Sequence, residues 1–323
     1  MGDQVNGNDE NQIWLVPDDL QAVRLDGFVR QCLPHLSRQE VHRAIAEKFF
    51  LLNGRVARKG DSLNGGDRLC FVGPADLLSD APPPARQLEI PIIYEDDSLL
   101  VVDKPAGVAT HGFSGRDRAT LANFLAAQRP GLLNIGKSRW EPGLVHRLDI
   151  ETSGVVLVAK TQAVFDRLRE QFRRREIKKT YLALVWGQPI ERGTIELALA
   201  HDRGDRRRMV AVQHRERSAD RRVWQAITRY RVIATASGMS LLEVDMETGV
   251  THQIRVHLSS NGYPIVGDTL YGADYPERFG LARHCLHASS LTLRHPASGQ
   301  LLCVDAQLPV ELREVLQRIE MAV

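Results

Sequence analysis

The stretch His146–Gly154, which reads HRLDIETSG, decides how the rest of the sequence is interpreted. It places Asp149 two residues after Arg147 and three residues before a Thr-Ser-Gly turn. The apolar run Val155–Ala159 follows at once and predicts a buried strand. A carboxylate at the mouth of a buried strand, beside a fixed cation, is a poor choice for stability, but desolvation and the nearby charge set its reactivity. Asp149 is therefore the first candidate for chemistry.

The bulk composition is that of an ordinary globular protein. The chain has 323 residues, which suggests one large or two unequal domains with enough apolar residues for a core. The net charge of +2 at pH 7 does not by itself indicate a nucleic-acid partner. The four cysteines lie far apart and form no C-x-x-C pair, which argues against a zinc or redox motif and fits a reducing cytoplasm.

No targeting segment or membrane span is evident in the sequence. Met1–Asn11 is polar and acidic and lacks the apolar run of a signal peptide. No apolar stretch is long enough to span a bilayer. We therefore expect a cytoplasmic protein in which residues 1–18 form a flexible tail.

Residues 19–75 have the pattern of a small, basic α/β domain. Ser37 is a suitable helix N-cap, with Glu40 three residues later to complete a capping box. Asn53-Gly54 lies between two short strand-like runs and predicts a hairpin. The proline-rich segment over residues 76–87 cannot continue a helix or a sheet and predicts a stiff linker.

Residues 88–323 alternate strands and helices irregularly, which predicts an α+β domain with a mixed sheet. The expected elements are two strands within 93–103, a helix over 161–175, strands over 178–186 and 240–247, and a short helix capped by Thr251 and followed by Gly262.

The stretch around Asp149 resembles the HRLDxxTSG motif of the RluA-type pseudouridine synthases, which isomerise uridine to pseudouridine in structured RNA. Further family segments follow in the expected order over most of the chain. They are KPAGVATH at 104–111, KTYLA at 179–183, GVTHQIRVHL at 249–258, PIVGD at 264–268, LYG at 270–272, LHA at 286–288 and HP at 295–296. Any one string is weak evidence, but together and correctly spaced they identify the chain as a member of this family.

The resemblance implies a catalytic domain with a mainly antiparallel sheet flanked by helices and a site in a central cleft. Residues 19–75 resemble an S4 domain, a small RNA-binding fold that often precedes this catalytic domain. Ser37-Arg38, Asn53-Gly54, Lys59 and Gly66-Asp67 fall in the order expected for it. The alternative is a small structural lobe. An S4 domain favours large-subunit ribosomal RNA over transfer RNA as the substrate.

The reaction implied by the resemblance breaks the N1–C1′ bond of uridine, rotates the base and joins C5 to C1′. A single carboxylate can support these steps as a nucleophile or as a charge stabiliser near C1′ or C6. We assign this role to Asp149 in preference to capping of the turn that follows it. The steps need neither a metal nor a redox partner, so no cofactor is expected.

Three further residues take their roles from the resemblance. Arg255 matches the arginine that pairs with the catalytic aspartate, which keeps the carboxylate ionised and fixes its rotamer. Tyr181 matches the tyrosine that stacks on the target base and helps to move the C5 proton. Arg147 matches the arginine that fills the gap left by the everted base. The alternatives are core packing for Arg255 and Tyr181, and a phosphate contact or an ion pair with Glu151 for Arg147.

Two arginine-rich segments, over residues 165–179 and 203–222, indicate an RNA partner. Basic clusters on either side of a cleft fit phosphate binding better than a solvated face. The expected RNA-binding residues are Arg147, Arg38, Arg174, Arg175, Arg207 and Arg208, and Arg208-Met209 resembles a family loop that closes over RNA. Few exposed aromatic residues are evident, so we expect a structured RNA to be recognised by shape and backbone. A monomer is the default expectation for the oligomeric state.

The histidines near these motifs do not form a metal site. His252 and His257 lie five residues apart instead of the four of a helical zinc pair, and no carboxylate or cysteine completes a ligand set with them or with His146. All three are interpreted as structural. Lys104–Gly107 and Gly267-Asp268 are interpreted as scaffold turns around the cleft.

The sequence departs from the family pattern at two positions. Val250 stands where an arginine is usual, before Thr251, and Ile150 stands where a polar residue is common. The first change removes one expected phosphate or cleft contact. Activity is still expected, with a substrate that the sequence does not define.

Three other functions are compatible with parts of the pattern. A transfer-RNA-directed synthase would use the same chemistry. An RNA-binding assembly factor without catalysis is disfavoured, because Asp149, Tyr181 and Arg255 are all present. A glycoside hydrolase would need a second acid, and Glu151 lies too close to Asp149 in a tight turn to admit a sugar between them.

Overall fold

The computed structural model of the protein describes residues 12–112, 117–212, 222–275 and 277–321. The chain divides into two compact units, which are Met1–Pro83 with Gly112–Arg118, and Pro84–His111 with Ala119–Val323. We refer to them as unit 1 and unit 2. The division falls within the proline-rich segment over residues 76–87.

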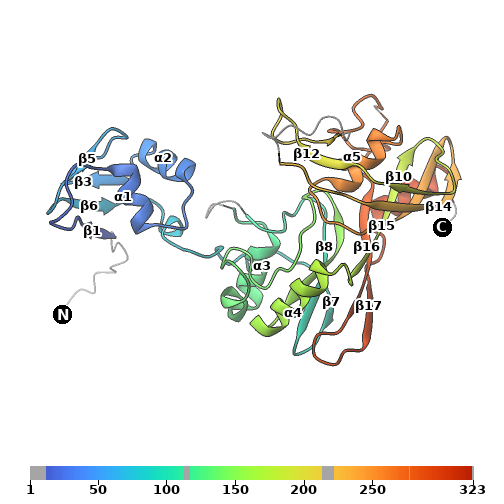
Figure 1. The fold of residues 1–323 in the computed structure, drawn as a ribbon, viewed down its shortest axis with the longest axis horizontal. Coiled ribbons are helices and arrows are strands. Elements are labelled where there is room, and N and C mark those ends of the chain that lie inside the picture. The colour runs from blue at the N-terminus through green and yellow to red at the C-terminus, as the bar shows by residue number, and fades with distance from the viewer. Residues whose placement is uncertain (1–11, 113–116, 213–221, 276, 322–323) are drawn as a thin grey trace, which may run out of the picture. The chain divides into compact units, whose positions relative to one another are not determined.

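Unit 1 packs two helices and a small sheet around one apolar core (Figure 1). Its four-stranded antiparallel sheet has the order β1-β6-β3-β4, and a separate strand pair is β2-β5. The elements are β1 (Ile13–Leu15), β2 (Val23–Arg24), α1 (Leu25–Cys32), α2 (Arg38–Ala46), β3 (Phe50–Leu52), β4 (Arg55–Val56), β5 (Ser62–Leu63), β6 (Arg68–Phe71) and the 3₁₀ turn η1 (Ala75–Leu77).

Most local predictions for unit 1 are confirmed. The Ser37 side chain accepts from the Glu40 amide, and the Glu40 carboxylate accepts from the Ser37 amide, so the capping box is present. Asn53-Gly54 turns the hairpin between β3 and β4 with both residues at positive φ. The prediction of a flexible tail over residues 1–18 is wrong for residues 13–16. β1 pairs with β6, and Val16, directly after β1, is buried in the unit 1 core, which holds this segment in place.

Unit 2 is built on a nine-stranded sheet, counted over the described residues. Its strands are β7 (Ile92–Glu95), β8 (Leu99–Lys104), β9 (Ser153–Ala159), β10 (Lys178–Trp186), β11 (Arg192–Ile195), β14 (Thr228–Ala236), β15 (Met239–Met246), β16 (Leu286–Arg294) and β17 (Leu301–Asp305). The order is β11-β14-β15-β10-β16-β9-β8-β7, with β17 also paired to β16. Neighbouring strands run antiparallel except for β16 and β9, which are parallel.

Helices cover both faces of this sheet. They are α3 (Leu121–Gln128), α4 (Gln162–Arg173), α5 (Gln253–Ser260) and α6 (Val310–Arg318). Unit 2 also contains a 3₁₀ turn, η2 (Pro130–Asn134), and a separate hairpin of β12 (Ala198–His201) and β13 (Met209–Val212). Side chains alternate along β8, so Leu100 and Val102 share one core with α3, α5 and α6, while Leu99 and Val101 share the other with α4. The expected α+β fold, with a mainly antiparallel sheet flanked by helices, is confirmed (Figure 1).

The helix α5 begins differently from the prediction. Its N-cap is His252, whose backbone is left-handed and whose side chain makes no capping bond, so Thr251 does not cap it. The loop before the helix is held instead by Gln253, whose Oε1 accepts from the Val250 amide and from the Thr248 hydroxyl. The helix ends as expected at Asn261 with Gly262 at positive φ.

Within the described residues, no helix has both the length and the apolar character that crossing a membrane requires.

Candidate active site

Asp149 lies in the loop that leads into β9, and two buried basic side chains hold the backbone of this loop. Lys104 donates from Nζ to the carbonyls of Ile150 (3.1 Å), Pro105 (2.8 Å) and Val108 (2.7 Å). Arg283 donates from Nη1 to the carbonyl of Glu151 (3.2 Å). Burial, together with the nearby Arg283 cation, lowers the pKa of Lys104 to about 7. Lys104, the last residue of β8, therefore directly fixes the segment that carries Asp149, and the predicted turn follows it at Ala106-Gly107.

The Thr-Ser-Gly turn that follows Asp149 is anchored by histidines from β16 and the loop before it. The Thr152 hydroxyl lies 2.9 Å from His284 Nε2, and the Ser153 hydroxyl lies 2.9 Å from His287 Nδ1. Gly154 allows the parallel pairing of β9 with β16, because a Cβ at this position would lie 2.1 Å from the Ala288 carbonyl oxygen. The motif is thus needed for the close contact of these two strands.

The Asp149 carboxylate faces an arginine that a second carboxylate holds in place. Arg255 on α5 lies with Nη1 3.4 Å from Asp149 Oδ2. It also donates from Nε and Nη2 to Asp268 at 2.7 Å and 3.0 Å. Burial alone would raise the pKa of Asp268, but the hydrogen bonds and charge of Arg255, together with the charge of His284 and the Tyr271 amide, lower it. Such a bidentate pair fixes the guanidinium in one orientation toward Asp149.

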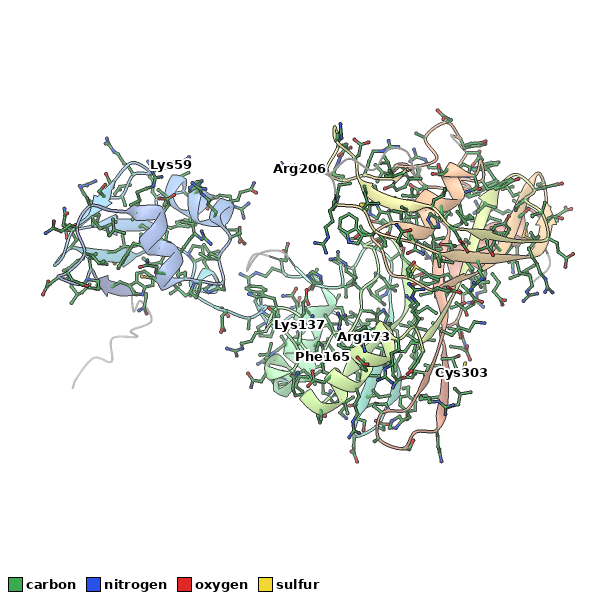
Figure 2. The ribbon with its side chains drawn as sticks, in the orientation of Figure 1. Lys59, Lys137, Phe165, Arg173, Arg206 and Cys303 are labelled. Atoms are coloured by element: carbon green, nitrogen blue, oxygen red, sulfur yellow. The ribbon has the colours of Figure 1, made fainter. Side chains whose placement is uncertain are left out.

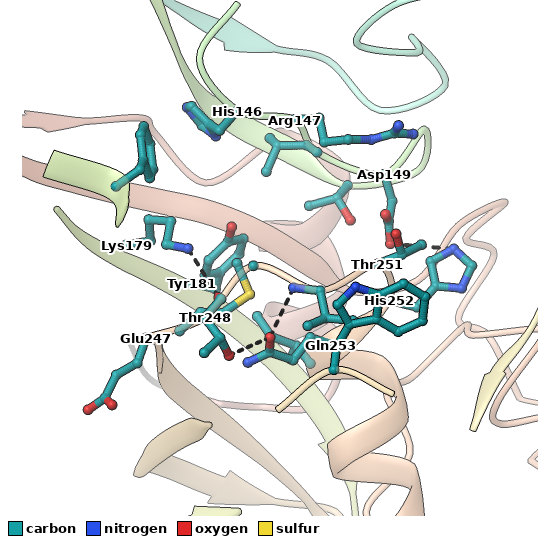
Figure 3. Close-up of a pocket in the computed structure, with 18 of the residues that line it drawn as sticks. His146, Arg147, Asp149, Lys179, Tyr181, Glu247, Thr248, Thr251, His252 and Gln253 are labelled. Atoms are coloured by element: carbon teal, nitrogen blue, oxygen red, sulfur yellow. Dashed lines mark hydrogen bonds and ion pairs between the residues drawn. The ribbon is translucent and has the colours of Figure 1, made fainter. Parts of the chain in front are cut away.

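These groups lie on the wall of a pocket of about 540 Å³ in unit 2. Tyr181 on β10 also lines it, with only 4% of its surface exposed. Burial raises the pKa of Tyr181, and the charge of Asp149 raises it further, so its hydroxyl stays protonated at neutral pH. Figure 3 shows Asp149, Tyr181 and His252 around the same pocket. Asp149, Tyr181 and Arg255, the three residues predicted to be catalytic, therefore line the same pocket.

The three histidines of the motifs differ in their surroundings. His257 is buried and both ring nitrogens have partners, Thr228 and the Leu197 carbonyl. His146 accepts from the Leu157 amide, and burial together with Lys179 and Arg169 lowers its pKa to about 3. Both fit the structural interpretation. His252 does not fit it fully, because its ring lines the pocket with Nε2 3.8 Å from Asp149 Oδ2.

The other end of the pocket is cationic. Its wall there includes Arg169, Arg173 and Arg175 from the end of α4, and Lys179 from the start of β10. Burial lowers the pKa of Lys179 to about 8, and its Nζ donates to the Thr248 carbonyl. Arg147 lines the pocket on the Asp149 side instead, beside His111 at 3.2 Å and not in an ion pair with Glu151 (Figure 3). Arg147 and Arg175, predicted to bind RNA, therefore face the pocket.

The remaining predicted RNA-binding arginines lie outside this wall. Arg174 and Arg207 are exposed and pair with nearby carboxylates, Glu170 and Asp205. Arg208, in the connection from β12 to β13, lies over the ring of Tyr271. Figure 2 labels Arg173 on α4 and Arg206 in that connection. Arg38 is exposed at the start of α2 in unit 1, and the predicted basic residues Arg215, Arg217 and Arg221 lie outside the described residues.

Sequence reasoning missed Asp268, Tyr271 and His252 as parts of the site. Asp268 lies in a turn, as predicted, but its carboxylate also holds Arg255. Tyr271, in the LYG segment, lies 2.8 Å from His252 Nδ1 through its hydroxyl. The available signal was the position of both residues in segments that the family resemblance had already marked. In the described part of the chain, no three His, Cys, Asp or Glu side chains gather as a metal site would require.

Comparison with known proteins agrees with this geometry. Residues 98–260 match the sequence model of a family described as RNA pseudouridylate synthase. The chain belongs to this family. It is 40% identical over 313 residues to an uncharacterized RNA pseudouridine synthase of Chloroflexus aurantiacus, covering 96% of this chain and 94% of that protein. It is 36% identical over 318 residues to the ribosomal large subunit pseudouridine synthase D of Nitrosomonas europaea, covering 96% and 88%.

Solved structures give the same family. The human RNA pseudouridylate synthase domain containing 4 protein aligns with a TM-score of 0.55 at 28% identity, over 72% of this chain and 94% of that one. The RluA-type assignment made from the motifs is confirmed, and with it an isomerase that converts uridine to pseudouridine in RNA. In this pseudouridine synthase, the pocket around Asp149 is the candidate active site.

Proposed function

We propose that this protein isomerises uridine to pseudouridine in large-subunit ribosomal RNA, with Asp149 as the reacting carboxylate. The observation that carries the proposal is the Asp149 carboxylate 3.4 Å from the buried Arg255, on the wall of a pocket of about 540 Å³. A pocket of this size is in the usual range for a bound small molecule or an everted nucleoside.

Asp149 would act at the sugar or at the base of the everted uridine. As the N1–C1′ bond breaks, the carboxylate either bonds to the carbon that becomes electron-poor or balances its positive charge. The base then rotates, C5 bonds to C1′, the C5 proton leaves and N1 gains a proton. Arg255 supports this role because its guanidinium lies 3.4 Å from the Asp149 carboxylate, and because Asp268 prevents it from turning away.

Tyr181 would form one wall for the base. A buried ring provides stacking, worth about 1–3 kcal/mol per base. Because burial and Asp149 raise its pKa, the hydroxyl would take part in C5 proton transfer as a protonated group and not as a phenolate.

The basic residues would hold the RNA around this pocket. Arg147 and Arg175 lie on the pocket wall, where they can reach the gap left by the base or a neighbouring phosphate. We assign Arg174, Arg207, Arg208 and, in an S4-like unit 1, Arg38 to weaker contacts with the RNA backbone. Replacing Arg38 by alanine should lower RNA affinity and leave the rate of the bound complex unchanged.

Ribosomal RNA is favoured as the substrate by two observations. Several relatives that match this chain over more than 90% of its length are named ribosomal large subunit pseudouridine synthase D, at 33–36% identity. Ser37-Arg38, Asn53-Gly54, Lys59 and Gly66-Asp67 also fall in the order expected of an S4 domain. Transfer RNA is the alternative substrate.

The test is a map of pseudouridine in ribosomal and transfer RNA from cells that lack the gene and carry either the wild type, Asp149→Asn or Asp166→Asn. The wild type and Asp166→Asn, an exposed change on α4, should restore at least one site in large-subunit RNA. Asp149→Asn should restore none but should still bind the RNA. Restoration by Asp149→Asn would contradict the catalytic role, and sites found in transfer RNA alone would contradict the proposed substrate.

We further propose that the protein works in the cytoplasm as a monomer. All four cysteines are free thiols, as a reducing compartment favours. Sedimentation of the purified protein at micromolar concentration should give a mass near 36.2 kDa, and a mass near twice this value would contradict the monomer.

A further inference from the structure

His252 occupies an unusual backbone position beside the reacting carboxylate. Its φ of 55° lies in the left-handed region, which is disfavoured for a side chain with a Cβ. Its ring is half-buried and lines the pocket, with Nε2 3.8 Å from Asp149 Oδ2 (Figure 3). Backbone strain of this kind tends to persist where a side chain must point in one direction.

The other ring nitrogen of His252 has a partner that defines which nitrogen carries the proton. Nδ1 lies 2.8 Å from the hydroxyl of Tyr271. The backbone amide of Met209 donates to the same hydroxyl oxygen at 2.8 Å. Because burial raises the pKa of Tyr271, the hydroxyl keeps its proton and can donate it to Nδ1. A neutral ring that accepts at Nδ1 carries its proton on Nε2, the nitrogen that faces Asp149.

The environment also favours the neutral ring. Burial lowers the pKa of His252, while the charge of Asp149 opposes this and the charge of Arg255 reinforces it. Asp268 and Arg147 contribute smaller and opposite effects. A neutral N–H directed at a carboxylate can support its ionised form without adding a second full charge.

The turn that contains Asp268 and Tyr271 orients both donors that face Asp149, which are Arg255 and His252. Asp268 holds Arg255 through its carboxylate, and the same carboxylate accepts from the backbone amide of Tyr271 at 3.0 Å. The Tyr271 ring lies edge-on to His252, and Arg255 and Arg208 each lie over it, at 5.0 Å and 5.4 Å from its centre. The β12–β13 hairpin, through Met209, and the Asp268 turn therefore meet at Tyr271.

We propose that His252 is a positioning residue for Asp149, with its Nε2–H directed at the carboxylate by the hydrogen bond that Tyr271 donates to Nδ1. The 3.8 Å gap is longer than a hydrogen bond, and gaps of this kind close when substrate is bound. The inference rests on the proposed role of Asp149. It adds that the reacting carboxylate has a second oriented hydrogen-bond donor, His252 Nε2. The β12–β13 hairpin helps to orient this donor through the bond from the Met209 amide to Tyr271.

Glutamine and asparagine separate this role from a structural one. The amide nitrogen of glutamine can occupy the place of imidazole Nε2, whereas that of asparagine reaches only the place of Nδ1. Asparagine, however, tolerates a left-handed backbone better. A positioning role predicts that His252→Gln is faster than His252→Asn although it is less stable, and a structural role predicts that rate follows stability.

The experiment measures C5-tritium release from a tritiated transcript of the large-subunit RNA segment that the wild type modifies, together with the melting temperature of each variant. His252→Asn and Tyr271→Phe should each lower kcat by about tenfold or more, the loss of one hydrogen bond to a charged group, with little change in KM. The double variant should be no slower than the slower single variant, because both changes remove one interaction. Tyr94→Phe, which removes a β7 phenol that donates to Asp96, is the matched control and should keep the wild-type kcat.

Three outcomes would overturn the inference: His252→Asn at least as fast as His252→Gln, losses that multiply in the double variant, or a change in KM alone. An inactive Asp149→Asn with a fully active His252→Asn would contradict this inference and leave the proposed function standing. A fully active Asp149→Asn would contradict the proposed function, and this inference with it.

Discussion

Arg255 and Arg173 line the same pocket, but their surroundings are opposite. The Arg255 side chain is 9% exposed and is held by a buried carboxylate from another part of the chain. The Arg173 side chain is 71% exposed and pairs with Glu170 one turn earlier on its own helix. The first arrangement fixes a charge in one orientation, and the second leaves it free to exchange its partner for a phosphate. The end around Arg255, called the fixed end, is thus built for chemistry. The end around Arg173, called the exposed end, is built for binding.

The largest effect should come from breaking the fixed end. Asp268→Asn leaves a buried guanidinium without its bidentate carboxylate, and loss of one partner of a buried pair typically costs about 3–5 kcal/mol in the free energy of unfolding. Urea denaturation measures this change. Glu170→Gln at the exposed end is the control and should leave the urea midpoint unchanged. Equal effects of the two changes would remove the distinction between the two ends.

The second test concerns the chemistry of the fixed end. Tyr181→Phe keeps the buried ring but removes the hydroxyl, so folding should be intact. If the hydroxyl takes part in proton transfer, C5-tritium release should fall by about 10²-fold or more. RNA affinity should not change, since stacking is retained. An unchanged rate would make Tyr181 a packing residue only.

Acid pH should lower the free energy of unfolding through His287, which anchors the turn after Asp149 at the fixed end. Burial lowers the pKa of His287, bonded to Ser153, to about 4 from its ordinary 6.5. Between these values the unfolded chain binds more protons, so the free energy of unfolding falls as the pH falls through this window. From pH 7 to pH 5 the loss from this group is about 2 kcal/mol. Denaturation at both pH values should show that His287→Gln is less acid-sensitive than the wild type by about this amount.

The smallest effect separates binding from stability at the exposed end. Arg175 follows the end of α4 at a φ of 59°, where glycine is favoured. Arg175→Gly should raise the free energy of unfolding by about 1 kcal/mol, because the backbone strain is relieved. It should also weaken RNA binding several-fold and lower the salt slope of binding by about one. Arg174→Ala is the matched loss of charge, and equal or tighter RNA binding by Arg175→Gly would contradict a phosphate contact.

The sequence predicted most of the local structure. The apolar run after Gly154 forms β9, the stripe from Val164 to Phe172 forms the packed side of α4, and Asn53-Gly54 turns a hairpin. These features depend on neighbours in the chain. The pairing of Arg255 with Asp149 spans 106 residues and was inferred only from the family resemblance.

The features that the sequence did not reveal depend on tertiary contacts. Asp268 beside a glycine has the pattern of an ordinary turn, and only the fold shows that Arg255 lies against it. The left-handed backbone of His252 has no local signal, because glycine or asparagine would be expected there. Tyr271 matters because its hydroxyl accepts a hydrogen bond from the Met209 amide on the β12–β13 hairpin, which no spacing in the sequence indicates.

The buried amine of Lys104 offers a way to observe the segment that carries Asp149. All of its surface is enclosed, and its three carbonyl partners include that of Ile150, next to Asp149. An acylating reagent cannot reach it until this segment opens, whereas exposed lysines react at once. The slow labelling rate of this one side chain, followed by mass spectrometry, therefore reports how often the segment opens, and bound RNA should slow it further.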